Sequence, residues 1–306
     1  MRANIEKNLL LGFALAGFGT LLFSLKSIFI KFLYLQGLDA DIVLVLRMAL
    51  SLPIYVGVLL WLYVSSDAVK NLNQNIIAKV FLLGFFGYYL ASLLDLMSLE
   101  LISAQLERLG LFTYPFMVAV LGSLFFEERI TKRIIFSLVI TYAGLFVVMG
   151  QELKLTGEGV IEGTLLVLGA ALSFALYVLF SKKHIRHLGS QLFTCLAMIS
   201  SCVFGLLHGV VVLDIGSLVV NPVAWFWLIM LVVLSTVLPS FMMVEAIDRI
   251  GPTQTGIVGM LGPIFTIALA IQLLDEAFTM WLVVGVALMM LGVWNLMRSE
   301  VSAVKR

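Results

Sequence analysis

Residues 102–131 read ISAQLERLGLFTYPFMVAVLGSLFFEERIT, and a related pattern returns at residues 250–279 as IGPTQTGIVGMLGPIFTIALAIQLLDEAFT. The two stretches begin 148 positions apart, and both carry an internal proline, Pro115 or Pro263, and an acidic pair three and four residues before the final Thr. Weaker matches at an offset of 151 relate the beginnings of the two halves of the chain. The recurrence in order predicts a chain made of two related halves.

Composition places both halves in a membrane. The 306 residues are 62% hydrophobic and 12% charged, with a mean hydropathy of +1.12, which excludes a soluble domain with a polar surface. Crossing the hydrocarbon core of a bilayer takes about 20 apolar residues, so the polar interruptions divide the chain into spans. We predict ten transmembrane helices, at 9–33, 42–64, 76–98, 102–126, 133–150, 160–181, 190–212, 223–247, 253–274 and 279–297.

The distribution of Lys and Arg predicts the orientation. If the N-terminus is cytoplasmic, fourteen of the nineteen basic residues lie on that side and two on the other. Both termini are therefore expected in the cytoplasm, in a multi-pass protein of the cell membrane whose first apolar segment is retained as a span. Residues 1–151 and 152–306 hold five spans each, so the second half should be inverted relative to the first, an architecture of secondary transporters.

Five elements of the first half carry a family resemblance. In order they are FSLKSIFIKF at 23–32, LRMALSLP at 46–53, GYYLASLLDL at 87–96, ISAQLERLGLFTYP at 102–115 and LFFEERIT at 124–131. Together they resemble the EamA family of the drug/metabolite transporter superfamily, over residues 10 to 297. The resemblance implies an all-α fold of two inverted five-helix repeats around a central cavity. It also implies peripheral spans 5 and 10, often at a homodimer contact, but no particular substrate.

Five ionisable residues lie in the predicted outer part of the membrane, where a charge is costly and usually faces protein or water. They are Lys26, Arg47, Asp95, Glu107 and Arg108, and their charges sum to plus one. Three hypotheses remain open. The carboxylates pair with the cations as a structural clasp, an unpaired Arg47 or Arg108 binds the carboxylate of a substrate, or Asp95 or Glu107 takes part in proton coupling.

Hydroxyl groups form stripes on two spans. Tyr88, Ser92 and Asp95 recur at i, i+4 and i+7, and Ser173 and Tyr177 share a face of the sixth span. These side chains either line a pore or bond to their own helix. We interpret Tyr88, Ser92 and Tyr177 as part of the substrate path.

Small residues and prolines mark the other helix faces. Ser137, Thr141 and Gly144 on span 5 align with Gly285, Met289 and Gly292 on span 10, which predicts close helix packing or a dimer contact. Pro115 and Pro263 should kink spans 4 and 9, as hinges for alternating access or as static bends.

Two further features are interpreted as structural. The charged residues 127–133 form an interfacial loop in which Thr131 caps span 5. Cys195 and Cys202 are seven residues apart on one helix, too far for a disulfide, and are interpreted as small buried hydrophobes.

The function predicted from these features is a secondary transporter, an exporter of a small polar metabolite such as an amino acid. The sequence lacks HExxH, Gly-x-Ser-x-Gly and phosphate-loop motifs, so we expect no enzyme activity, no cofactor and no metal. Its partners should be a small-molecule substrate and the lipid bilayer, with no nucleic acid. The alternatives are an exporter of cationic or amphipathic drugs whose buried charges are purely structural, and a non-transporting membrane sensor or scaffold.

Overall fold

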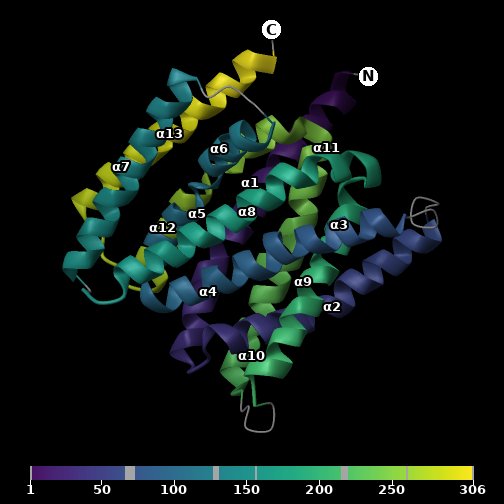
Figure 1. Cartoon of the computed structure of the whole chain (residues 1–306), viewed down its shortest axis with the longest axis horizontal. Coiled ribbons are helices and arrows are strands. Elements are labelled where there is room, and N and C mark those ends of the chain that lie inside the picture. Colours follow the sequence, from purple (N-terminus) through teal and green to yellow (C-terminus); the bar gives the residue numbers. More distant parts are fainter. Residues whose placement is uncertain are drawn as a thin grey trace.

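The computed structural model describes residues 2–65, 73–126, 131–155, 157–214, 220–259 and 261–304, and every regular element in these ranges is helical (Figure 1). The charged positions 127–130 of the predicted interfacial loop lie outside them, whereas Thr131 caps the next helix by accepting a hydrogen bond from Ile134 N at 3.3 Å. The elements are α1 (Arg2–Leu35), α2 (Ala40–Ser65), α3 (Gln74–Gly84), η1 (Phe85–Leu90), α4 (Ala91–Leu101), α5 (Ala104–Leu111), α6 (Tyr114–Phe126), α7 (Lys132–Leu155), α8 (Val160–Leu188), α9 (Ser190–Val212), α10 (Pro222–Val232), η2 (Val233–Val237), α11 (Leu238–Gly259), α12 (Leu261–Leu273) and α13 (Met280–Val304).

Eight helical segments among the described residues are long and apolar enough to cross a membrane, and they coincide with the first eight predicted spans. The last two predicted spans contain shorter apolar helices, Leu261–Leu273 and Met280–Asn295. The predicted link between spans 8 and 9 is not a break, because α11 continues as one helix through it. The chain is thus an all-helical, multi-pass membrane protein, and the count of ten spans stays a prediction.

Two spans contain a π-helical turn. In the third span η1 separates α3 from α4, and the amide of Ala91 donates to the carbonyl of Phe86, five residues earlier. In the eighth span η2 separates α10 from α11, and the amide of Leu238 donates to the carbonyl of Val233. The two π-helical turns begin 148 residues apart, the offset that relates the two halves of the sequence.

Pro115 does not kink a continuous helix in span 4 as we predicted. The fourth span is broken between α5, which ends at Leu111, and α6, which begins at Tyr114. Pro115 is the second residue of α6, a position at which a helix needs no amide donor, so its missing N–H costs no hydrogen bond. Position 260, just before α12, lies outside the described residues, so the predicted kink at Pro263 stays a prediction.

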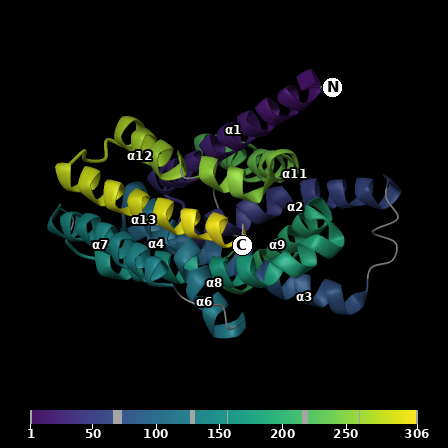
Figure 2. The same cartoon turned by 90° about the horizontal axis from the view of Figure 1, so that it is seen from above.

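Helices of the first half pack mainly on helices of the second half. The most extensive pairs are α1 with α11, α2 with α9, α4 with α8, and α7 with α13. The last pair runs side by side in both views (Figures 1 and 2). The main apolar core lies where α1, α2, α4 and α10 meet, around Ile28, Leu44, Leu99 and Leu228.

The predicted small-residue face is buried between α7 and α13 of the same chain. A Cβ added to Gly144 would lie 2.5 Å from the carbonyl oxygen of Gly285, and one added to Gly292 would lie 2.0 Å from Thr141 Oγ1. The Asn295 amide also donates to Ser137 Oγ at 2.9 Å. We call Ser137, Thr141, Gly144, Gly285 and Gly292 the small-residue seam. Because the seam is filled within one chain, a dimer through these helices would have to use their other faces.

The outer surface of the bundle is apolar. Large hydrophobic side chains are exposed on many helices, among them Trp61 on α2, Phe136 on α7, Val211 on α9 and Leu291 on α13. In water such a surface would favour aggregation, whereas in a bilayer it meets lipid chains of the same polarity.

Candidate functional site

The short helix α5 carries Glu107 and Arg108, and two carboxylates hold its first turn. Glu152 of α7 accepts hydrogen bonds from Ser103 N and Ser103 Oγ, both at 2.6 Å. Glu276, from the loop before α13, accepts from the amides of Ala104 at 2.7 Å and Gln105 at 3.2 Å. These bonds satisfy amides that a helix start leaves unpaired, and the negative charges complement the helix dipole.

Our sequence reasoning did not predict that Glu276 and Glu152 hold the start of α5. The only signal was the acidic pair at 275–276, which we used as a match between the two halves and not as a helix cap. Burial raises the pKa of Glu276, and the amides that donate to it act in the opposite direction. The third contact at this helix start is Lys31, which donates to the carbonyl of Ile102 at 2.7 Å.

The central feature of the site joins α1, α4 and α5. Lys26 of α1 forms an ion pair with Asp95 of α4, and Ser27 of α1 donates to Glu107 Oε2 at 2.6 Å. Asp95 is 1% exposed and Glu107 is fully buried. We call Lys26, Ser27, Asp95 and Glu107 the buried charge network. It brings together three of the five ionisable residues that we predicted to lie at one depth of the membrane.

The network leaves two oxygen atoms without donors. Asp95 Oδ1 and Glu107 Oε1 are buried, and neither accepts a hydrogen bond within the described part of the chain. The two carboxyl groups are themselves within hydrogen-bonding reach of each other. Buried polar atoms without partners are uncommon and costly, so this arrangement requires a physical reason.

Arg47 lies beside the network but outside its ion pair. The residue is 4% exposed, and Nε has no hydrogen-bond acceptor among the described residues. Its guanidinium interacts electrostatically with Asp95 of α4 and with Cys202 of α9. Arg47 therefore adds positive potential to the network without fixing either carboxylate.

The guanidinium of Arg108 lies beside Gly262 of α12. A Cβ on Gly262 would lie 3.2 Å from Arg108 Nη2 and 3.5 Å from Thr20 Cγ2, so the missing side chain at Gly262 leaves room for the guanidinium. Arg108 is half-buried, and among the residues that the structure describes it forms no ion pair and no side-chain hydrogen bond. The two adjacent residues thus have different surroundings, as their separation of about 100° around a helix requires.

The predicted hydroxyl stripe is divided between two environments. Tyr177 donates to the hydroxyl of Tyr88 at 3.3 Å, and Ser173 donates to the carbonyl of Phe86 at 2.7 Å. Tyr88 belongs to the π-helical turn η1, which changes the angular spacing between it and Asp95, while Ser92 lies half-buried between them. Tyr88 and Tyr177 therefore form a pair between α8 and η1, separate from the buried charge network.

A second polar cluster joins α2, η1 and α9. His208 Nε2 is 3.0 Å from Asp41 Oδ1, and His208 Nδ1 is 3.0 Å from the hydroxyl oxygen of Tyr89. This cluster was not predicted from the sequence, because no short-range pattern relates three residues on different helices.

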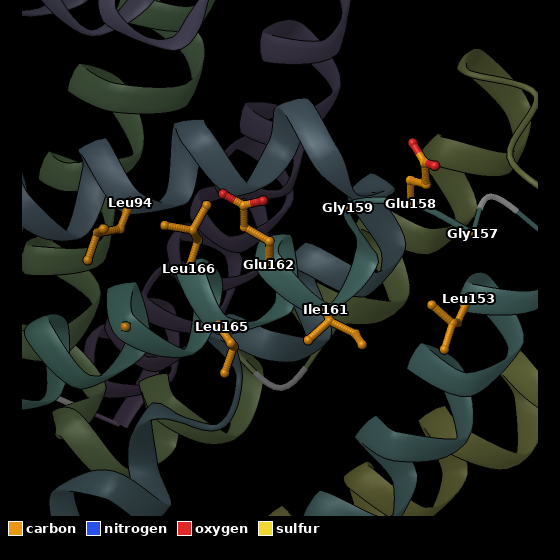
Figure 3. A pocket seen from close by; sticks show the side chains of 10 residues that line it. Leu94, Leu153, Gly157, Glu158, Gly159, Ile161, Glu162, Leu165 and Leu166 are labelled. Atoms are coloured by element: carbon orange, nitrogen blue, oxygen red, sulfur yellow. The ribbon is translucent and has the colours of Figure 1, made fainter.

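A pocket of about 650 Å³ lies between α4, the α7–α8 turn and α8 (Figure 3). Leu94, Leu165 and Leu166 form part of its apolar wall, and the carboxylates of Glu158 and Glu162 lie at its side. Neither the buried charge network nor Arg108 lines it. The pocket opens onto the apolar outer surface, where Leu165 is 64% exposed, so it is not the chamber expected around the buried charges.

Known proteins share this architecture. The sequence profile of the EamA-like transporter family matches the chain twice, over residues 10–150 and 161–298. The uncharacterized transporter YcbK of Bacillus subtilis (strain 168) is 26% identical over 271 residues, which cover 87% of this chain and 86% of that protein. A chain of known crystal structure, 13% identical, superposes with a TM-score of 0.64 over 95% of this chain and 96% of its own length, which shows a common fold.

The profile covers most of the chain, including each residue of the buried charge network. The family and the similar transporter of B. subtilis agree with a helical membrane protein without the catalytic motifs of an enzyme. The chain belongs to the EamA-like transporter family and is a membrane transporter rather than an enzyme.

Proposed function

We propose that this transporter exports a small polar metabolite that bears a carboxylate, such as an amino acid, by alternating access between two inverted five-helix halves. It is a secondary transporter, driven by a solute or ion gradient. The family leaves the substrate and the direction of transport open, so the proposal depends on the charges of this chain.

Helix packing supports the two inverted halves. If the halves are exchanged, each span takes the place of the span five further on. The pair α1 with α11 then becomes the pair α8 with α4, while α2 with α9 and α7 with α13 are each mapped onto themselves. The π-helical turns η1 and η2 obey the same exchange. Such pairing is expected when two related units face each other across a pseudo-two-fold axis.

The guanidinium of Arg108 is the observation that carries the substrate class. It lies between α5 of the first half and α12 of the second, half-buried and without an ion pair in the described part of the chain. A guanidinium binds a carboxylate through two parallel hydrogen bonds, and it keeps its charge at any physiological pH. A site between two moving halves is also where alternating access would expose a solute to either side.

A flux assay in proteoliposomes tests the proposal. Radiolabelled amino acids and organic cations are offered separately to wild-type protein, Arg108→Gln, and the control Arg133→Gln, which changes an exposed Arg at the start of α7. We expect the carboxylate solute to cross, with a rate at least about tenfold lower in Arg108→Gln, because a charge-assisted hydrogen bond contributes roughly 1.5–3 kcal/mol. The rate of Arg133→Gln should equal that of the wild type.

Two results would contradict the proposal. Flux of organic cations without flux of amino acids would favour the drug exporter, with the buried charges only structural. The absence of flux for both classes, in protein that is folded and correctly inserted, would favour the sensor or scaffold.

A further inference from the structure

Two carboxyl groups from different helices meet beneath α1. Asp95 comes from α4 and Glu107 from α5, and each has one oxygen that is engaged: Asp95 Oδ2 by Lys26, and Glu107 Oε2 by Ser27. The remaining oxygens, Asp95 Oδ1 and Glu107 Oε1, have no donor among the described residues. One hydrogen atom between the two carboxyl groups would give this pair the donor that it lacks.

Electrostatic repulsion between the two carboxylates favours that hydrogen atom. Two adjacent carboxylates in a buried site repel each other strongly, so they hold one proton between them and titrate as a pair. The ammonium group of Lys26 contacts Asp95 directly and favours its ionised form. The proton consequently resides mainly on Glu107, from which it is donated to Asp95.

We propose that Asp95 and Glu107 form a binding site for one proton, held in place by Lys26 and Ser27. The site alternates between two states. In one, Glu107 is protonated beside an ionised Asp95, and in the other both carboxyl groups are ionised. No covalent bond other than O–H forms or breaks. Asp95 and Glu107 therefore form a reversible proton-binding site where α1, α4 and α5 meet. The family assignment does not specify such a site.

Other titratable groups set the potential at this site. Lys26, Lys31 and Tyr34 of α1, Arg47 of α2 and Arg108 of α5 act on one or both carboxyl groups, and Glu152 and Glu276 act on Lys31. The segment Leu261–Leu273 of α12 has no titratable side chain, and Glu162 of α8 is exposed. The surroundings are mainly positive, which keeps Asp95 ionised and allows the proton on Glu107 to leave.

Proton binding would also change the charge that a substrate meets. Lys26, Arg47, Asp95, Glu107 and Arg108 sum to plus one when all are ionised and to plus two when the pair holds its proton. A carboxylate solute bound at Arg108 would therefore favour the protonated state, and by linkage a bound proton would favour the solute. This consequence depends on the proposed function, whereas the proton site itself does not.

Infrared spectroscopy of the purified protein tests the site without any transported solute. The spectrum is recorded as a function of pH for the wild type, Glu107→Gln, Asp95→Asn, and the control Glu162→Gln, which alters an exposed carboxylate. Above about pH 6 ordinary carboxyl groups are ionised, so a remaining protonated-carboxyl band identifies an unusual group. We expect this band in the wild type and in Glu162→Gln, and its loss in both variants of the pair.

A conservative variant keeps the test decisive if either replacement prevents folding. Ser27→Ala removes the hydroxyl that donates to Glu107 Oε2, which disfavours the ionised form. We expect the midpoint of the band to rise by roughly half a pH unit or more. A wild-type spectrum without the band, or a band and midpoint that no replacement changes, would overturn the proton site.

The outcome is separable from that of the flux assay. Carboxylate flux without the infrared band would leave the proposed function standing and remove the proton site. The band without any solute flux would leave a proton site in a protein whose proposed substrate class is wrong.

Discussion

The buried charge network and the small-residue seam both place polar atoms between helices at membrane depth, yet they do so in opposite ways. In the seam, backbone approaches backbone, and the polar groups are neutral hydroxyls and one amide. In the network, charged groups from three helices meet, and two carboxylate oxygens lack donors among the described residues. Neutral close packing yields a rigid contact, whereas an incompletely satisfied charge cluster has more than one protonation state.

The largest effect on stability is expected from removing one partner of the ion pair. Asp95→Ala leaves the ammonium group of Lys26 in a site where its side chain is only 16% exposed. We expect the free energy of unfolding to fall by about 3–5 kcal/mol, because an uncompensated buried charge remains. Equilibrium unfolding in mixed micelles measures it.

The matched control is Glu245→Ala, which removes a carboxylate paired with Arg249 on the same helix, with both side chains at least 27% exposed. It should cost less than about 1 kcal/mol. Equal losses of unfolding free energy for the two variants would mean that the ion pair of the network contributes no more than a surface ion pair. The contrast with the seam would then disappear.

The next effect comes from filling the seam. In Gly292→Ala the new Cβ would lie 2.0 Å from Thr141 Oγ1 and 2.7 Å from the carbonyl oxygen of Ser137, so α7 and α13 must separate. We expect a loss of about 1–3 kcal/mol in unfolding free energy, as for other overpacked cores. The same unfolding assay reports it.

Gly150→Ala serves as its control, since a Cβ on Gly150 would meet no atom within 4 Å. Alanine is the better helix former, so this variant should be neutral or slightly stabilising. If Gly292→Ala behaves in the same way as Gly150→Ala, the two helices are not held as closely as the structure indicates.

The smallest effect is expected from the hydrogen bond at the end of the seam. Asn295→Ala removes the donor to Ser137 Oγ and should lower the unfolding free energy by about 1 kcal/mol. The double variant Asn295→Ala with Ser137→Ala distinguishes this bond from the packing. If the bond is real, the double variant should lose less unfolding free energy than the sum of the losses of the two single variants. A strictly additive result would argue against the bond.

Local patterns in the sequence predicted the seam but not the partners within the network. Ser137, Thr141 and Gly144 lie at i, i+4 and i+7, and helix geometry alone places them on one face. Asp95 contacts Lys26, 69 positions away in the sequence, and Glu107 contacts Ser27, 80 positions away. Both contacts depend on how close the helices lie to one another. Spacing along one helix carries no information about that distance.

The sequence also did not predict the π-helical turns or the position of the helix break. Residues 85–90 read FFGYYL and lie inside one long apolar segment, Gln74–Leu101, so hydropathy does not distinguish a π-helical turn from an α-helical one. Pro115 did indicate that span 4 is irregular. It could not show that the break precedes the proline, because proline is compatible both with a kink and with the first turn of a helix.

The π-helical turns also bear on how relatives of this chain can differ in length. A π-helical turn closes its hydrogen bond over one more residue than an α-helical turn, so η1 and η2 each contain a residue that the rise of the span does not require. A homologue with one residue fewer in FFGYYL could restore a regular helix while Asp95 still faces Lys26. Insertions and deletions of a single residue are therefore expected to be tolerated at these two places in evolution, and an alignment that forbids gaps inside spans would misplace the network.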